Sequence, residues 1–404
     1  MDLQAMFDIV AQRSDNWYGS SENTSNSSLY MDFLTRHPSL SYTYLSVLGV
    51  LTIIGNIGNI MVIGSVLSYK PLRTTGNLFI ANLALADLCV TAIVDPFSIV
   101  GVVNGPQFFM DKPLLCHVVA CICLASCTCS MWNIAAVAIN RYVFLCKPQL
   151  YPVLFTWRKT LSYCLLLWLV CFALEVPNMT GWGGHTFDLK TMACSYDRLA
   201  NITYTYTFCA VGILLPIIAV FISYLKIFIY ARRTRKELKR ISGSKCLIYG
   251  KSKYKSRRQE ELQLARTLFC VCIIFLICWT PYATVVVLDY DDRWSKIVYV
   301  VVIQMAHTNS SVNFMLYWLM NQRFKRGYQQ FASRIQKCIK MMRPRRHNNS
   351  SLNLSVSCTS LTTRDSVNML TCDNSLQKFR DTSRQDHTSS GLTESSFSEF
   401  RKMF

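Results

Sequence analysis

One acidic residue, Asp87, lies near the middle of the apolar stretch 75–103. A charge at the centre of a lipid bilayer costs at least about 3 kcal/mol, so a carboxylate there predicts both a function and partners. Polar residues at similar depth in other apolar stretches could supply these partners: Asn59, Ser126, Ser130, Asn309, Ser310 and Asn313. Their oxygens could hold a small cation such as sodium beside the carboxylate, or form a hydrogen-bond network that only stabilises packing.

Two other ionisable residues lie at the ends of apolar stretches. Arg141 ends one stretch within an N-R-Y sequence, and Glu261 begins another. A bond between this guanidinium and this carboxylate could latch the two helices together, and breaking it would let the second helix swing outward. Glu261 could equally be an acid that the helix dipole favours at a helix start. Pro216 and Pro281 each free a backbone carbonyl, so both are expected to kink their helices.

Most of the 18 cysteines lie inside the apolar stretches. Four have a spacing that could suggest metal ligands: Cys121, Cys123, Cys127 and Cys129. Residues two apart on a helix point about 200° apart, so these are expected to be small buried residues and no metal site is predicted. Cys116 and Cys194 differ because both are expected on the oxidising side of a membrane. A bridge between them would pin a loop over the helices.

Cys338 lies at the end of an amphipathic stretch, 324–339, in which apolar residues alternate with basic ones. This pattern predicts a helix that lies along the inner leaflet of a membrane. A palmitoyl group on Cys338 would anchor it, and an unmodified thiol is the alternative.

These side chains need membrane helices to position them. A bilayer core about 30 Å thick requires roughly 20 mostly apolar residues per helix. Seven stretches meet that length: 42–67, 75–103, 114–145, 159–176, 204–229, 266–288 and 296–320. With 51% hydrophobic and 16% charged residues among 404, the chain has too few charges for a water-soluble enzyme, where about 25% is usual. The predicted fold is an all-α membrane protein, a seven-transmembrane helix bundle (42–320) followed by a short amphipathic eighth helix (321–340).

Basic residues orient this bundle. Of the 42 Lys and Arg residues, 27 lie in or beside four loops on one side of the predicted bundle, together with a single acid, Glu237. The positive-inside rule makes these loops cytoplasmic, which places the amino terminus outside the cell at the plasma membrane. The net charge of +19 therefore indicates contact with anionic lipid, and nucleic acid is not an expected partner. Glycosylation sequons on the predicted outside begin at Asn23, Asn26, Asn178 and Asn201.

The two ends of the chain differ from the bundle. The segment 1–41 is expected to be an extracellular glycosylated tail. The segment 341–404 has 20 Ser or Thr residues between positions 350 and 398 and few aromatic residues. It is expected to be a disordered cytoplasmic tail, either a substrate for kinases or a solvated segment without regulation.

No catalytic motif accompanies these features. The six His residues have no paired metal spacing, and neither a G-x-S-x-G sequence nor a P-loop is present. An enzyme is therefore not expected, and neither is a cofactor other than the possible sodium ion. A membrane transporter remains the non-receptor alternative, although the internal repeats typical of transporters are missing.

Eight motifs, in order along about 300 residues, resemble the rhodopsin-like (class A) G-protein-coupled receptors. They are G-N-I-M-V with Asn59, L-A-L-A-D-L with Asp87, the pair Cys116 and Cys194, N-R-Y with Arg141, Trp168, Pro216 with Tyr224, F-x-x-C-W-T-P from Phe275 to Pro281, and N-F-M-L-Y from Asn313 to Tyr317. The resemblance implies a ligand pocket among the outer halves of the helices and a heterotrimeric G protein bound inside. It also implies a receptor kinase and arrestin at the tail. The residues implied in activation are Asn140, Arg141, Tyr142, Tyr224, Glu261, Phe275, Trp279, Pro281, Asn313 and Tyr317.

Within this class the chain looks most like the melatonin receptors, because of the N-R-Y sequence, the V-P-N sequence at 176–178 and a seventh span without its usual proline. Other motifs, including L-R-T-x-x-N-L and C-S-Y-D-R, resemble the medium-chain fatty-acid receptor and related insect receptors of barrier glia and germ-cell migration. Asn140 replaces the usual acid beside Arg141, and Phe314 replaces the usual proline. Both changes would weaken the off-state latch, so raised basal signalling is expected.

The ligand is the least specified part of the prediction. Asn178 matches the melatonin receptors' binding asparagine, and glycosylation of its sequon would compete with ligand contact. Tyr196 preserves an aromatic residue of those receptors, whereas Arg198 replaces their glutamine and suits a carboxylate better. The segment 116–130 contains no acid, so an amine bound there is not expected. Further candidates for the pocket lining are Asp95, His185, Gln304 and His307. A retinal pigment is excluded because the stretch 297–320 contains no lysine.

Overall fold

The computed structural model describes residues 38–241 and 250–342. The longer helices are α3 (Pro38–Ser68), α4 (Thr75–Cys89), α5 (Asp95–Met110), α6 (Pro113–Cys146), α8 (Trp157–Ala173), α11 (Leu215–Ile241), α12 (Gly250–Leu288), α13 (Lys296–Met320) and α14 (Gln322–Met342). Shorter elements are η1 (Lys70–Leu72), η2 (Val90–Val94), α7 (Tyr151–Leu154), α9 (Val176–Thr180), α10 (Ile202–Phe208), η3 (Cys209–Leu214) and the strands β1 (His185–Asp188) and β2 (Ala193–Tyr196).

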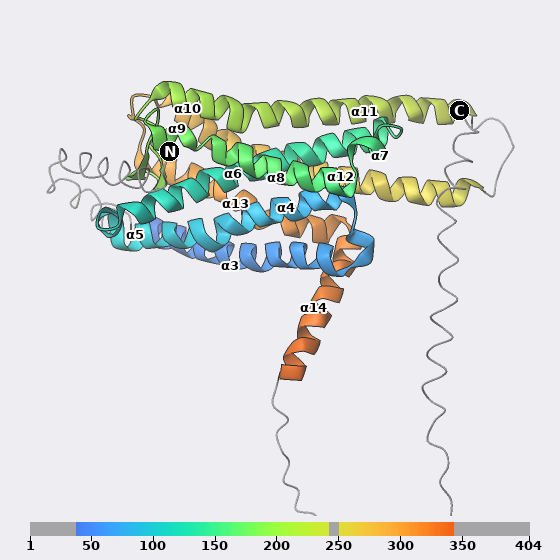
Figure 1. Ribbon diagram of the computed structural model, residues 1–404, viewed down its shortest axis with the longest axis horizontal. Helices are drawn as coiled ribbons and strands as arrows, with labels where there is room; N and C mark the ends of the chain where they lie inside the picture. The colour runs from blue at the N-terminus through green and yellow to red at the C-terminus, as the bar shows by residue number, and fades with distance from the viewer. Residues whose placement is uncertain (1–37, 242–249, 343–404) are drawn as a thin grey trace, which may run out of the picture. The chain divides into compact units, whose positions relative to one another are not determined.

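These elements form a bundle of seven spans, as the sequence predicted. The spans are α3, α4 with η2 and α5, α6, α8, α10 with η3 and α11, α12, and α13, which run side by side in Figure 1. Within the described ranges, six spans are long and apolar enough to cross a membrane by length and composition. The remaining span, α13, is less apolar because it carries polar side chains such as Gln304, Asn309 and Asn313.

Apolar side chains cover the outside of this bundle. Leu165 and Leu169 of α8 are each 67% exposed, and Phe221 of α11 is 66% exposed. Polar residues such as Asp87 and Asn133 are instead fully buried. An apolar exterior around a polar interior suits lipid, where helices satisfy their own backbone groups. The chain is therefore a multi-pass membrane protein.

Prolines interrupt three spans. Pro216, the second residue of α11, directly follows the π-helical turn η3, whose wider repeat accommodates a carbonyl that has lost its N–H partner. Pro281 lies inside α12. Gly105 breaks the helical backbone of α5 just before Pro106, and its φ of 76° is a conformation that glycine adopts without strain. The expected departure from α geometry near Pro216 is thus present as a π turn.

The fourth span ends earlier than the predicted range 159–176. Helix α8 stops at Ala173, and the separate turn α9 begins at Val176 with Pro177 near its start. Proline has no N–H to continue the ladder of α8 but is well accommodated in a first turn. This break places Asn178 on a short turn of its own.

Strands β1 and β2 form an antiparallel hairpin between α9 and α10. His185 pairs with Tyr196, and Phe187 pairs with Cys194. A disulfide joins Cys194 to Cys116 at the start of α6, with 5.3 Å between the Cα atoms. The predicted bridge is confirmed, and it fixes the hairpin against the helix that lies against α4, α8 and α11.

Helix α14 follows α13 directly at the opposite end of the bundle, as Figure 1 shows. Phe324 and Tyr328 on its first turns are buried, and the Tyr328 hydroxyl donates to the Phe314 carbonyl at 3.3 Å. Cys338 and Ile339, near its end, are exposed. The predicted amphipathic helix is therefore present and attached by its first half. The predicted tails lie largely outside the described residues, with Asn23 and Asn26 among them.

Candidate functional site

The bundle has two ends with different polar groups. We call the end that carries β1, β2 and the disulfide the hairpin end, and the end where α6 finishes after Arg141 the Arg141 end. Polar residues on the inner faces of the helices form a middle group between these two ends.

Asp87 forms the centre of the middle group. Its two carboxylate oxygens accept hydrogen bonds from Ser130 Oγ and Asn313 Nδ2, each at 2.8 Å. Asn59 Nδ2 donates to the Ser310 carbonyl at 3.0 Å. All of these side chains are buried. The predicted network therefore joins α3, α4, α6 and α13 around one carboxylate.

Two predicted members of this network behave differently. Ser126 donates to the Ile122 carbonyl of its own helix, and among the described residues it makes no hydrogen bond to the other predicted members. Asn309 is buried, and its Oδ1 has no partner within the described residues. Asn313 Oδ1 likewise has no hydrogen-bond partner among the described residues. Two amide oxygens are thus available near the Asp87 carboxylate.

A second polar network was not predicted from the sequence. Asn82 of α4 donates to Asn133 Oδ1 of α6 at 2.9 Å and accepts from Trp168 Nε1 of α8 at 3.0 Å. Asn82 stands five residues before Asp87, directly before the L-A-L-A-D-L segment. Its amide binds both neighbours and fixes α4, α6 and α8 relative to one another.

Toward the hairpin end, Asp95 and His307 meet. The Nδ1 atom of His307 lies 2.8 Å from Asp95 Oδ1, and both residues are buried, at 5% and 0% exposure. Asp95 Oδ2 has no hydrogen-bond partner among the described residues. Gln304 lies one turn along α13 from His307. Neither its Nε2 nor its Oε1 atom has a hydrogen-bond partner among the described residues. The structure therefore brings together these three predicted pocket residues.

Asn178 lies at the other side of the hairpin end. Its Nδ2 donates to the Tyr204 hydroxyl at 2.6 Å and to Glu175 Oε2 at 3.2 Å. The same Glu175 oxygen lies 3.1 Å from His185 Nε2 on β1. Glu175 was not predicted, although an acid three residues before the V-P-N asparagine could have indicated it.

This geometry corrects one prediction. Asn178 is only 7% exposed, and both hydrogens of its amide are used inside the bundle. An acceptor for a glycan needs an accessible amide nitrogen, so the predicted glycosylation of Asn178 does not fit the structure. Asn201, by contrast, is partly exposed at the start of α10, where its side-chain oxygen accepts from the Thr203 N–H.

Tyr196 lies against two further aromatic rings. Its ring centroid is 5.2 Å from that of Phe208 and 6.2 Å from that of Tyr204. Since Tyr204 also binds Asn178, the predicted residues Asn178 and Tyr196 belong to one aromatic and amide cluster, built from α9, β2 and α10.

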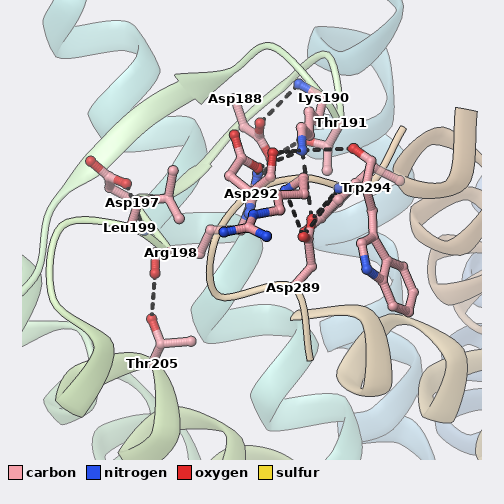
Figure 2. A network of polar contacts seen from close by, with 12 residues as sticks. Asp188, Lys190, Thr191, Asp197, Arg198, Leu199, Thr205, Asp289, Asp292 and Trp294 are labelled. Atoms are coloured by element: carbon pink, nitrogen blue, oxygen red, sulfur yellow. Dashed lines mark hydrogen bonds and ion pairs between the residues drawn. The ribbon is translucent and has the colours of Figure 1, made fainter. Parts of the chain in front are cut away.

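Arg198 is paired with the chain's own carboxylates. Its Nη2 lies 2.5 Å from Asp292 Oδ1, and its Nε lies 3.7 Å from Asp188 Oδ2 (Figure 2). Its guanidinium also lies 4.4 Å from the ring centroid of Tyr299. Arg198 thus meets Asp292, 94 positions away, through Nη2, whereas its Nη1 has no hydrogen-bond partner among the described residues. Its predicted contact with a ligand carboxylate stays a prediction.

Lys190 extends the same contact, as Figure 2 shows. Its Nζ lies 2.6 Å from Asp292 Oδ1 and 3.6 Å from Asp289 Oδ2, and it donates to the carbonyls of Asp292 and Trp294 at 2.7 Å each. We call Asp188, Lys190, Arg198, Asp289 and Asp292 the hairpin–loop network. It fastens the hairpin to the loop between α12 and α13.

Charges in this network are held by their neighbours. Burial alone would lower the pKa of the Arg198 guanidinium, but the carboxylates of Asp188 and Asp292 outweigh it and raise that pKa above its ordinary value. Burial would likewise raise the pKa of Asp289, but hydrogen bonds from the Tyr299 hydroxyl and the backbone of the loop lower it. Arg198 and Asp289 are thus both held in their charged forms by their neighbours.

At the Arg141 end, Asn140 binds a loop residue. Its Nδ2 donates to the Tyr151 hydroxyl of α7 at 3.5 Å, and that hydroxyl is 3.0 Å from Thr75 Oγ1 at the start of α4. Arg141 itself is only 6% exposed. A Cβ at Gly76 would clash with its guanidinium, so α4 approaches Arg141 through a glycine. The Glu261 side chain lies outside the described residues, so the predicted latch stays a prediction.

The remaining residues implied in activation line the inner faces of α11, α12 and α13. Phe275, Trp279 and Tyr317 are buried, at 1%, 5% and 1% exposure. Tyr317 stacks on Phe324 of α14 with 5.1 Å between ring centroids. Tyr224 lies edge to face with Phe269 of α12 at 5.4 Å.

Tyr142 contacts α11 on the same end of the bundle. Its ring centroid lies 5.2 Å from Lys226 Nζ. Residues 140–142 therefore point to three different neighbours: the α7 turn, the start of α4 and α11. The arrangement links the end of α6 to α7, α4 and α11.

Comparisons with known proteins agree with these features. The family described as 7 transmembrane receptor (rhodopsin family) matches residues 58–317. The human melatonin receptor type 1B is 31% identical over 72% of this chain and 79% of its own length. The melatonin receptor type 1A of Phodopus sungorus is 28% identical over 72% and 80%. The crystal structure of squid rhodopsin superimposes with a TM-score of 0.65 at 22% identity, over 74% of this chain and 87% of that one.

A seven-span bundle, a bridged hairpin and a buried Arg141 thus coincide with a family match over most of the bundle. The chain belongs to the rhodopsin family of G-protein-coupled receptors and is similar to the melatonin receptors.

Proposed function

We propose that this receptor binds a small, melatonin-like molecule at the hairpin end and responds by activating a heterotrimeric G protein at the Arg141 end. The observation that carries the proposal is the cluster of Asn178, Tyr196, Tyr204 and Phe208. It combines a buried amide with three aromatic rings. Aromatic faces favour a flat ring such as an indole, and an amide can hydrogen-bond a polar substituent on it.

A carboxylate lipid is the alternative ligand that the sequence suggested. The Arg198 side chain is 9% exposed and contacts Asp292 and Asp188. A ligand carboxylate would have to displace these acids or approach a guanidinium whose charge they already balance. Breaking such a pair leaves a charge without a partner, which is costly in a buried site. The structure therefore favours the melatonin-like ligand.

Activation requires the Arg141 end to open. Here Asn140 stands in the place of the acid that usually restrains the neighbouring arginine. Asn140 carries no charge and binds Tyr151. Pro281 weakens the backbone ladder of α12 about two turns before the helix ends at Leu288. We propose that α12 swings outward about this point and exposes Arg141 to the G protein. Raised basal activity follows from the missing charge.

The middle group suits a regulatory ion. Sodium prefers oxygen ligands, and the carboxylate of Asp87, the Ser130 hydroxyl and the amide oxygens of Asn309 and Asn313 lie on facing helices. The donor set fits a small cation, which these residues would hold between α4, α6 and α13. The ion would supply a positive charge that stabilises the Asp87 carboxylate.

The chain's placement follows from the charge pattern. We propose a plasma-membrane receptor with an extracellular amino terminus, glycans at Asn23, Asn26 and Asn201, and a palmitoyl group on the exposed thiol of Cys338. The basic face of α14 would contact anionic lipid. Receptor kinase and arrestin would bind the Ser- and Thr-rich tail.

The test measures guanine-nucleotide exchange on purified G proteins by receptor in lipid nanodiscs, with and without melatonin. We expect melatonin at micromolar concentration to accelerate exchange. The Asn178→Ala variant should weaken its potency about 10-fold or more, since a buried hydrogen bond of about 1–2 kcal/mol is lost. Asn201→Ser, which keeps the helix-capping oxygen, is the matched control. Failure of melatonin together with activation by decanoate would favour the carboxylate alternative.

A further inference from the structure

A group of polar atoms without partners lies deep in the hairpin half of the bundle. Asp95 is fully buried, and only one of its two carboxylate oxygens has a partner, the Nδ1 of His307. Gln304 precedes His307 by three residues on α13, so both side chains lie on the same face of that helix. Both amide atoms of Gln304 are buried, and neither has a partner among the described residues.

Such atoms are costly when left alone. A buried donor or acceptor has lost its water, and without a replacement bond the full desolvation penalty remains. Other buried amides of this bundle show the usual solution. The Asn82 amide, for example, binds both Asn133 and Trp168. The Asn178 amide uses its nitrogen in this way, and its Oδ1 has no partner among the described residues. Gln304 differs from both because neither end of its amide has a partner there, and it lies beside the unpaired oxygen of the Asp95–His307 pair on the inner face of α13.

The chemistry of these atoms restricts what that group is. Asp95 Oδ2 only accepts hydrogen bonds, so it requires a donor. With the Asp95 carboxylate ionised, the Asp95–His307 pair is neutral when His307 is protonated and negative when His307 is neutral, so it offers no net positive charge to a ligand. A ligand carboxylate placed there would face an acceptor and no compensating cation.

The nearby cations do not change this balance. Lys190 and Arg198, the buried or half-buried basic residues of the hairpin, are matched by the three acids Asp188, Asp289 and Asp292. A ligand carboxylate would add a further negative charge beside these acids. The aromatic and amide cluster around Asn178 adds no charge of its own beyond the Glu175 that it already binds.

We propose that Asp95 and Gln304 form a second polar subsite of the ligand pocket, which receives the hydrogen-bond donor of a neutral or cationic ligand and rejects a carboxylate. The donor, an N–H or O–H, binds Asp95 Oδ2, and the Gln304 amide binds a neighbouring polar atom of the same substituent. This inference rests on the proposed function, since it specifies the class of molecule that occupies the same pocket.

The first experiment needs no ligand. It compares the melting temperatures of purified receptor, Gln304→Leu and the matched control Asn82→Leu in nanodiscs. If the Gln304 amide has no partner, leucine removes an unpaired polar group, and the melting temperature rises by roughly 2–4 °C. Asn82→Leu breaks two bonds and lowers it. A fall for Gln304→Leu that matches Asn82→Leu would mean that the amide is held by the chain or by structural water, and would overturn the subsite.

The second experiment uses three indoles that share a ring and differ in their end group. Tryptamine ends in an ammonium, N-acetyltryptamine in a neutral amide N–H, and indole-3-propionate in a carboxylate. At about 1 mM, we expect one or both of the first two to raise the melting temperature of the receptor and the third to leave it unchanged. Asp95→Asn and Gln304→Leu should each reduce the shift at least by half.

Each contrary outcome counts against the subsite. A larger shift with indole-3-propionate, no shift with any of the three indoles, or shifts that survive both substitutions would overturn it. Ligand-free nucleotide exchange, measured on the same preparations, separates this failure from a failure of the proposed function. Exchange that persists shows a working receptor whose ligand contacts lie elsewhere, whereas loss of exchange at every G protein would overturn the proposed function itself.

Discussion

Replacing Asp292 by asparagine should loosen the hairpin from the loop between α12 and α13. Asp292 Oδ1 contacts both Lys190, at 2.6 Å, and Arg198, at 2.5 Å. The backbone of Asp292 has a φ of 56°, a left-handed conformation that asparagine also tolerates. The Asp292→Asn substitution therefore removes one charge and leaves the shape of the loop unchanged.

The magnitude follows from exposure. The side chain of Arg198 is 9% exposed and that of Lys190 is 18% exposed, but Asp292 is 35% exposed and partly screened by solvent. Two charge-assisted bonds screened to this extent contribute about 1–2 kcal/mol together. The melting temperature of the purified receptor should fall by roughly 2–6 °C. High salt should reduce the difference between wild type and variant, because exposed charges are screened first.

The adjacent acid provides the control. Asp291 pairs with Arg293, whose side chain is 81% exposed, at 3.0 Å. Asp291→Asn changes the same net charge one residue away and should alter stability by less than about 0.5 kcal/mol. Thermal denaturation of both variants, monitored by intrinsic fluorescence at low and high salt, makes the comparison. Equal melting temperatures for the two variants would refute the idea that Asp292 holds the hairpin–loop network together.

Three further predictions concern other parts of the molecule. Tyr151→Phe removes a hydroxyl that joins Thr75 and Asn140, which costs the off state about 1 kcal/mol. Ligand-free nucleotide exchange should therefore rise roughly 5-fold. An unchanged rate would show that this contact does not restrain the off state. The pKa of Asp289 is lower in the folded receptor than in the unfolded chain, where it is about 3.9, so the ionised carboxylate adds stability above that value, and this stability is lost as the pH falls through the folded pKa. The melting temperature should therefore show no Asp289-dependent change between pH 5 and 7 and should fall below about pH 4. If the Asp289→Asn variant lost as much stability below about pH 4 as the wild type does, this prediction would be contradicted. Mass spectrometry of receptor from mammalian cells should find a glycan at Asn201 and none at Asn178, and a glycan at Asn178 would show that its amide is accessible.

The spans and the middle group were predictable because each rests on local sequence. Stretches of roughly 20 apolar residues must cross a bilayer as helices. A carboxylate such as Asp87 inside one of them must find polar partners, and Ser130 and Asn313 were among the few available. The bridge between Cys116 and Cys194 followed from compartment and position in the same way.

Other contacts depended on how loops meet, which local patterns do not specify. Arg198 was expected to meet a ligand carboxylate, because nothing near it in the sequence shows that Asp292 folds back onto it. Asn178 was expected to be a ligand contact or a glycan acceptor; nothing near it in the sequence shows that Tyr204 and Glu175 take both hydrogens of its amide and leave its Oδ1 for a ligand. Ser126 lay at the expected depth but turned its hydroxyl to its own backbone, a choice that depends on rotamer rather than on spacing.

Signalling by this receptor requires the Arg141 end to open and admit a G protein. The most direct measurement is the distribution of distances between spectroscopic labels at Lys147, directly after α6, and at Arg257 in α12, recorded in nanodiscs with and without nucleotide-free G protein. We predict that G protein shifts the distribution to longer distances by several ångströms, and that Arg141→Ala abolishes the shift. An unchanged distribution in the presence of bound G protein would contradict the account.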